Sequence, residues 1–473
     1  MTKRFFSLGC FVALFTLTTF FARAETKLPS ILGSHMVLQQ GEACPIWGWD
    51  EAGTEVTVSF GGQTHTAKAG NNGRWQVSLT AMKVSAKGRA LTVKGSSTVK
   101  LEDVLVGEVW LCSGQSNMEW TVSRSTNAKQ EIADAKHPLI RHIKIPHQLS
   151  NQPRDKMSAG GWQPCTPKVA GNFTAVGYYF ARHLQSEIMV PIGLIGSNWG
   201  GTRIEPWTPP VGFKGVPALK KDFTDRLEVF GKAKVGSRTP THMYNAMIHP
   251  LLPYTIKGAL WYQGESNNGE GMLYYQKMRA LIAGWRSVWH NPDLPFYFVQ
   301  LAPFQYGGNS KNLPGIWQAQ LTAAKTIPHT GMAVTTDITT LRNIHPPNKQ
   351  DVGKRLALWA LAKDYGKKDI VYSGPLFRSM EVKGGRAVLK FDHGKGLKSR
   401  DAKPLTHFEL LSPEGQWFPA GAYVNEGGLI VSSKAVRNPR GVRFGWDQLA
   451  TPNLVNGAGL PASPFTSKAG KGL

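Results

Sequence analysis

The chain has 473 residues, 41% of them hydrophobic and 18% charged, which suits a globular enzyme with a sizeable core and more than one domain. Its formal net charge is +24, and such a surface attracts polyanions without specificity, so acidic glycans are candidate partners. Because the basic residues are scattered and form neither a basic helix nor a recognised nucleic-acid motif, binding of nucleic acid is disfavoured.

The first 24 residues have the pattern of a secretory signal peptide. Lys3 and Arg4 precede an apolar stretch over residues 5–21, and Ala22-Arg23-Ala24 offers the small-x-small pattern that a signal peptidase cuts. A permanent amino-terminal anchor is the alternative, but the cleavage pattern favours removal. No other stretch is apolar and long enough to span a bilayer, so we expect a periplasmic or secreted protein without a membrane span after cleavage.

Four cysteines are too few for a disulfide scaffold. Cys10 leaves with the signal peptide, and Cys44, Cys112 and Cys165 remain. An odd count leaves at least one thiol free, so one disulfide could form and none is required.

Residues 25–103 are predicted to form an amino-terminal β module. Short β-branched and aromatic runs, such as residues 54–60 and 75–79, alternate in polarity and are broken by glycine turns. This pattern is typical of a small β-sandwich.

Residues 104–371 change to an alternation of strands and helices, and this predicts a parallel sheet covered on both faces. Expected strands lie near residues 104–111, 192–196, 256–262, 295–301 and 331–336, and expected helices over 174–188, 271–288 and 349–362. The short-strand pattern returns over residues 372–473, for example at 387–391 and 428–432, and predicts a second β module.

The first candidate for chemistry is Ser116, within Gly-Gln-Ser-Asn-Met at 114–118, because it follows an apolar run that is typical of a buried strand. Gly114 lets the backbone turn sharply, and small polar neighbours leave the hydroxyl room to meet a carbonyl. A plain turn is the alternative explanation for a lone Gly-x-Ser.

Two later polar loops also follow apolar runs. Residues 263–267 supply amide groups, and residues 343–346 contain His345. In an open parallel sheet, ligands bind beyond the carboxyl ends of the strands, so these loops are expected to converge on one crevice. A serine, a histidine and amide donors in one crevice make an acyl-transfer site.

Together these segments resemble the sialate O-acetylesterase family of the SGNH (GDSL-like) hydrolases. The resemblance covers nearly the whole chain, through residues 36–39, 47–49, 114–118, 199–207, 244–250, 261–267, 344–346, 453–454 and 459–465. It implies an SGNH-like sheet flanked by helices, with β-sandwich-like modules at both ends. It also implies hydrolysis of O-acetyl esters on a sugar or glycan, typically sialic acid, without a cofactor.

The resemblance assigns Ser116 as the nucleophile and His345 as the general base. An unassisted hydroxyl is a poor nucleophile, so a hydrogen-bonded imidazole is required. The oxyanion would be held by the backbone amide of Ser116, by that of Gly200 or Gly201, and by a side-chain amide. The side-chain donor of the wider superfamily is an asparagine in a Gly-x-Asn-Asp block that this chain lacks; Gln263 is favoured in its place, with Asn267 as the alternative.

A second departure concerns the group that orients His345. The superfamily commonly has an aspartate three residues before its histidine, and this position is Arg342, which cannot accept a hydrogen bond. A backbone carbonyl of residues 342–344 is favoured as the acceptor, and Asp337 at the end of the preceding strand is the alternative.

Three further residues are candidates for substrate binding. Arg203 could pair with a sugar carboxylate or form an ion pair with Glu205. Gln115 adjoins the nucleophile. Glu265 could tune the site or brace its own loop, and bracing is favoured.

The sequence contains no metal-binding motif, because His137, His142 and His147 lack a second cluster of ligands and are expected at the surface.

Two other functions stay open. One is an esterase of acetylated plant or algal polysaccharide such as xylan or pectin, which would need the same acyl-transfer residues. The other is a non-catalytic carbohydrate-binding protein, which would not need Ser116 with His345.

Overall fold

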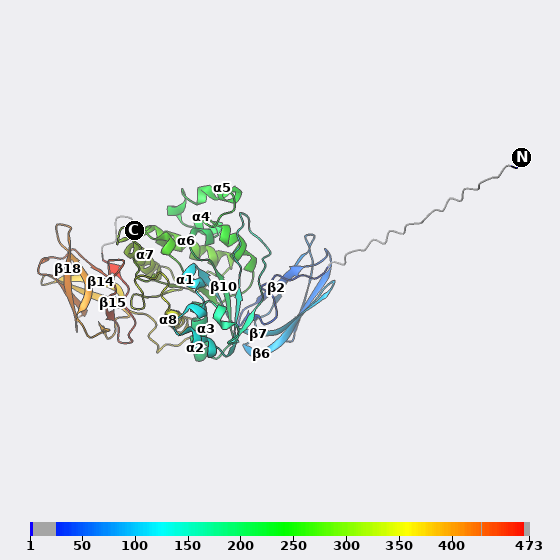
Figure 1. Ribbon diagram of the computed structural model, residues 1–473, viewed down its shortest axis with the longest axis horizontal. Helices are drawn as coiled ribbons and strands as arrows, with labels where there is room; N and C mark the ends of the chain where they lie inside the picture. Colours follow the sequence, from blue (N-terminus) through cyan, green and yellow to red (C-terminus); the bar gives the residue numbers. More distant parts are fainter. Residues whose placement is uncertain (3–24, 427, 468–473) are drawn as a thin grey trace.

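The computed structural model describes residues 1–2, 25–426 and 428–467. These form three parts along the long axis of the molecule: an amino-terminal β module, a central α/β part and a carboxyl-terminal β module (Figure 1). The predicted signal peptide, with Cys10, lies almost wholly outside the described residues. Within the described residues, no helix combines the length and apolarity needed to cross a membrane.

The amino-terminal module packs two sheets, antiparallel except where β1 pairs with β7, around buried Trp47, Trp75, Val56 and Val58. The larger sheet joins β3 to β4 and β6, and β6 to β7; β2 pairs with β5 in the smaller one. The strands are β1 (Val37–Gln39), β2 (Cys44–Trp49), β3 (Glu55–Phe60), β4 (Gln63–Lys68), β5 (Arg74–Leu79), β6 (Ser85–Lys94) and β7 (Thr98–Gly114).

Strand β7 connects this module to the central sheet, and the predicted boundary between residues 103 and 104 lies inside it. Its first half pairs with β6, and its second half pairs in parallel with β10 and β11. All residues from Val104 to Gly114 are buried, which explains the long apolar run in the sequence. The segment that delivers Ser116 is therefore anchored on both sides.

The central sheet has the order β13-β12-β11-β7-β10-β8-β9, and every neighbouring pair is parallel except β8 with β9. This confirms the predicted parallel sheet. Its other strands are β8 (His137–Lys144), β9 (Gln163–Cys165), β10 (Ile192–Asn198), β11 (Gly258–Tyr262), β12 (Phe296–Val299) and β13 (Thr330–Ala333).

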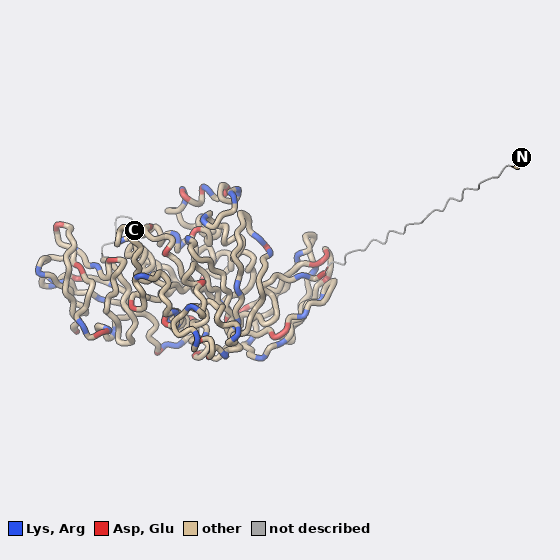
Figure 2. Tube along the Cα trace, viewed as in Figure 1, with Lys and Arg blue, Asp and Glu red and all other residues tan. Residues whose placement is uncertain are grey.

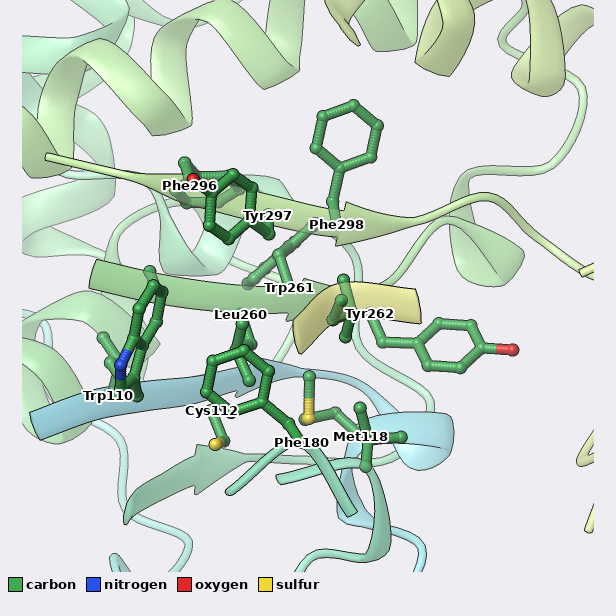
Figure 3. Close-up of a cluster of buried hydrophobic side chains, with 14 of the residues drawn as sticks. Trp110, Cys112, Met118, Phe180, Leu260, Trp261, Tyr262, Phe296, Tyr297 and Phe298 are labelled. Atoms are coloured by element: carbon green, nitrogen blue, oxygen red, sulfur yellow. The ribbon is translucent and has the colours of Figure 1, made fainter. Parts of the chain in front are cut away.

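Helices cover both faces of this sheet, with α3 and α8 on one side and α6 and α7 on the other (Figure 1). The helices are α1 (Ser116–Glu119), α2 (Ala128–Ala133), α3 (Ala175–Ile188), α4 (Pro210–Lys214), α5 (Leu227–Lys232), α6 (Leu273–Val288), α7 (Asn312–Thr326) and α8 (Lys349–Lys363). Aromatic side chains fill the layers between sheet and helices, including Trp110 with its ring 4.9 Å from that of Phe180 (Figure 3).

The carboxyl-terminal module is a seven-stranded antiparallel sheet, in the order β14-β15-β19-β18-β17-β20-β22. It is nearly closed, because Phe377 of β14 stacks on Phe465 of β22 at 4.3 Å. Its strands are β14 (Leu376–Lys383), β15 (Arg386–Asp392), β17 (Leu405–Leu411), β18 (Trp417–Asn425), β19 (Gly428–Ser432), β20 (Gly441–Phe444) and β22 (Phe465–Thr466); β16 (Lys398–Ser399) pairs separately with β21 (Leu454–Val455).

The structure also bears on the predictions about cysteines and about the distribution of basic residues. Cys44, Cys112 and Cys165 are all buried free thiols, so no disulfide links them. Lysine and arginine are spread over all three parts of the molecule, in agreement with the scattered pattern in the sequence (Figure 2).

Candidate active site

Ser116 is the first residue of α1 and lies two residues beyond the end of β7. The turn between them depends on Gly114, whose φ of +131° is rare for other residues. A Cβ atom there would lie 2.2 Å from the carbonyl oxygen of Tyr262. Next in the chain, the N–H of Gln115 donates to that same oxygen at 2.9 Å. The neighbouring strand thus fixes the direction in which Ser116 leaves the sheet.

His345 lies beside Ser116, although the two are 229 positions apart in the chain. Its Nε2 is 2.7 Å from Ser116 Oγ. The imidazole stacks on Trp120, with ring centres 4.9 Å apart, and the backbone N–H of His345 donates to Asn343 Oδ1 at 2.9 Å. The structure therefore brings the predicted nucleophile and base into hydrogen-bonding contact.

Burial lowers the pKa of His345, and the positive charges of Lys349 and Arg124 lower it further. A lowered pKa keeps the imidazole neutral near pH 7, which is the form that accepts a proton. The local charges thus favour a base over an acid in the resting protein.

The alternative in which Asp337 orients His345 is not realised in the structure. The Asp337 carboxylate forms a two-pronged ion pair with Arg355, at 2.6 and 2.7 Å, and both side chains are largely buried. Arg355 also donates to the carbonyl of Val334, so it fixes the end of the strand. The favoured carbonyl acceptor is not seen either, since His345 Nδ1 has no hydrogen bond among the described residues.

The predicted backbone donors to the oxyanion differ in whether they already have an acceptor. The backbone N–H groups of Ser116 and Gly201 have no acceptor among the described residues. The N–H of Gly200 instead donates to Glu119 Oε2 at 2.7 Å. A Cβ at Gly200 would stand 3.2 Å from the Cβ of Ser116, so a side chain there would crowd the nucleophile.

Gln263 and Asn267 are fully buried and committed to other partners, which corrects their predicted role as oxyanion donors. Gln263 Nε2 donates to Gln115 Oε1, Thr202 O and Asn267 Oδ1 at 2.8 to 3.1 Å. The side-chain N–H groups of Asn267 point to the carboxylates of Glu205 and Glu270. These amides brace the loop and have no donor left for a substrate.

Arg203 forms the ion pair that the sequence offered as its alternative role. Its guanidinium donates to Glu205 and Glu270, and to the carbonyl of Ser266. Buried Lys277 completes the cluster through the same two carboxylates, at 2.5 to 2.8 Å. Gln115 is also buried, and its Oε1 accepts bonds from the Gln263 loop.

Sequence reasoning placed one polar side chain of this part of the molecule wrongly and did not single out Asn117 or Lys349. His142 is buried in β8 and stacks on Phe173, so the expectation of a surface position was wrong. His147 is exposed, as expected, and it stacks on Trp199 at 4.2 Å and contacts Glu119 Oε1 at 2.6 Å. Asn117, Glu265 and Lys349 form a buried chain beside Ser116 and His345. The burial of Lys349 could not be recognised from the sequence, because the other lysines of the same helix are exposed.

Comparison with known proteins decides the family. A family model described as carbohydrate esterase, sialic acid-specific acetylesterase, matches residues 106–362. The chain belongs to this family. It is accordingly an ester hydrolase, and the matched region contains both Ser116 and His345.

Similar proteins support the same assignment over nearly the full length. The sialate O-acetylesterases of Rattus norvegicus and Homo sapiens are 30% and 31% identical, each over 93% of this chain and over 94% and 92% of their own lengths. A solved structure of a novel carbohydrate acetylesterase from Xanthomonas citri is 37% identical, with a TM-score of 0.86. It covers 94% of this chain and 100% of its own, and so confirms the fold with its terminal β modules.

Proposed function

We propose that this protein is a sialate O-acetylesterase that releases acetate through an acetyl-enzyme on Ser116, with His345 as the base. The observation that carries the proposal is the 2.7 Å contact between Ser116 Oγ and His345 Nε2 at the carboxyl end of β7. The names of the mammalian relatives support sialic acid as the sugar.

In the proposed reaction, His345 Nε2 takes the hydroxyl proton as Ser116 Oγ attacks the acetyl carbonyl carbon. The N–H groups of Ser116 and Gly201 stabilise the oxyanion, each contributing about 3 kcal/mol to lowering the barrier. When the intermediate collapses, His345 returns the proton to the departing sugar oxygen. A water molecule, deprotonated by the same imidazole, then hydrolyses the acetyl-enzyme.

A second candidate substrate is an acetylated neutral polysaccharide. The observation favouring it is that the Arg203 guanidinium is already bound by Glu205 and Glu270 and is not free to pair with a sugar carboxylate. The solved relative from Xanthomonas citri, described only as a carbohydrate acetylesterase, is compatible with either sugar.

The sequence also leads us to propose export to the periplasm or the medium after cleavage behind Ala24. Amino-terminal sequencing of the exported protein should begin at Glu25. Detection of the intact amino terminus on the mature protein would contradict this.

The test of the proposed function compares acetate release from O-acetyl sialic acid and from acetyl xylan, by wild type and by Ser116→Ala. We expect faster release from the sialic acid, and a loss of about 10⁴-fold or more in the variant because no nucleophile remains. Faster release from xylan would favour the second candidate. Full activity of Ser116→Ala would remove the proposed nucleophile.

A further inference from the structure

A chain of three buried polar side chains lies beside the catalytic pair and has no part in the reaction described so far. Asn117 follows the nucleophile and is 1% exposed. Its Nδ2 donates to Glu265 Oε1 at 2.6 Å, and its Oδ1 accepts from Lys349 Nζ at 2.5 Å. Lys349 is completely buried at the start of α8, and Glu265 is buried in the short helix after β11.

Asn117 also reaches the histidine loop directly. The same Nδ2 donates to the carbonyl oxygen of Ile344 at 3.0 Å, one residue before His345. The residue after the nucleophile is thus bonded to the residue before the base. This is the one side-chain hydrogen bond, among the described residues, between α1 and the 342–346 loop besides the Ser116 to His345 contact itself.

The charges on either side fix which way the Asn117 amide points. An ammonium group faces its oxygen, whereas a carboxylate and a carbonyl face its nitrogen. Rotating the amide by half a turn would place oxygen against oxygen and N–H against ammonium. Because a buried polar group that is left unpaired costs stability, the observed orientation is strongly preferred.

We propose that Asn117 is a positioning residue that sets the separation of His345 from Ser116, and that Lys349 and Glu265 hold its amide in the orientation that does so. The inference rests on the proposed roles of Ser116 and His345. It assigns a function to a buried lysine and a largely buried glutamate that act through Asn117.

Burial shifts the pKa of both charged members in the direction that weakens their charges. It lowers the pKa of Lys349 to about 7 and raises that of Glu265, and each is partly offset by the other. One oxygen of Glu265, Oε2, is buried without a partner among the described residues. Such a costly arrangement is expected where a protein needs a fixed geometry more than it needs stability.

The decisive variant is Asn117→Asp, which keeps the size of the side chain but replaces the donor that faces Glu265 and Ile344. We expect kcat to fall by about 10 to 100-fold with KM within about threefold, since a shift of about 1 Å in a catalytic group costs that much. The second readout is the rate at which a fluorophosphonate labels Ser116, which requires the base but no sugar binding. It should fall in parallel with kcat.

The double variant Asn117→Asp with Glu265→Gln separates positioning from stability. The introduced glutamine can donate to the introduced aspartate, and Lys349 gains a direct carboxylate partner, so thermal stability should recover. The bond to the Ile344 carbonyl stays absent, so kcat and the labelling rate should stay low. Recovery of the rate together with stability would show that Asn117 only supports the fold and would overturn the proposal.

Two controls make the result specific. Asn456 is likewise 1% exposed and bridges two loops of the carboxyl-terminal module through the carbonyls of Ser373 and His393. Asn456→Asp should lower stability without changing the labelling rate of the folded protein. Ser116→Ala should abolish labelling; if it does not, the proposed nucleophile fails, whereas wild-type labelling of Asn117→Asp contradicts only the positioning role.

Discussion

Two polar regions near the ends of the central strands look alike in sequence but differ in how their hydrogen bonds are used. Around Ser116 and His345, reactive atoms meet each other and backbone donors remain free among the described residues. In the loop after β11, the side-chain N–H groups of Gln263 and Asn267 all donate to protein acceptors. The acceptors of Asn267 are the carboxylates of Glu205 and Glu270. The N–H groups beside Ser116 are therefore available to a substrate, whereas the amides of the loop after β11 only hold that loop in place.

The largest effect is expected from replacing His345 in the first region. In His345→Ala the Ser116 hydroxyl loses its only proton acceptor in the described structure, so kcat should fall by at least about 10³-fold. Acetate release at saturating substrate measures this, and circular dichroism checks the fold. A fall of less than tenfold would mean that another group activates the serine.

A substitution in the second region, the loop after β11, should lower stability more than activity. Gln263→Leu leaves the Thr202 carbonyl without its donor and weakens the contacts to Gln115 and Asn267, so unfolding free energy should fall by about 2 to 4 kcal/mol. Urea denaturation measures this loss. The rate per folded molecule should stay within about tenfold, whereas a loss of about 10² to 10³-fold would restore Gln263 as an oxyanion donor.

The fold and the proximity of Ser116 and His345 could be predicted from the sequence because both follow from local patterns. The buried run before Ser116 and the apolar strands that follow indicated the sheet, and helices α3, α6 and α8 begin and end within two residues of their predicted bounds. Helix α7 was missed because Pro314 and Gly315 interrupt its apolar pattern in the first turn, where both are tolerated.

The partners of each polar residue could not be predicted, because they come from distant segments. Arg355 lies 18 residues beyond Asp337 and on another element, yet it takes both carboxylate oxygens. Glu119 takes the Gly200 N–H from 81 residues away. Sequence patterns identify which residues can donate or accept, but only the packing of elements decides which of them are already satisfied.

A smaller effect is expected at Asp337, and it sharpens the contrast with a three-residue catalytic site. Replacing the aspartate by asparagine in such a site lowers kcat by about 10⁴-fold. Here Asp337→Asn should change kcat by less than about tenfold, because the carboxylate is bound to Arg355 and not to His345. The broken ion pair should lower stability by about 3 kcal/mol, which thermal unfolding measures. A much larger loss of kcat would place Asp337 in the catalytic machinery.

The smallest expected effect concerns pH. His345 must be neutral to accept the proton, and burial together with the charges of Lys349 and Arg124 lowers its pKa. Activity should therefore be retained as pH falls to the ordinary histidine value of about 6.5, and be lost only below that. Lys349, with a pKa of about 7, is mainly protonated in this acid range and contributes its charge.

Removing one of those charges should move the acid limb of kcat/KM in a known direction. In Arg124→Gln the limb should shift to higher pH, because the imidazolium form is no longer opposed by that guanidinium. The shift should be partial, since burial, the larger cause, is unchanged. Arg124→Lys keeps the positive charge and should leave the limb near its wild-type position. Movement of the limb to lower pH in Arg124→Gln would show that the titrating base is not His345.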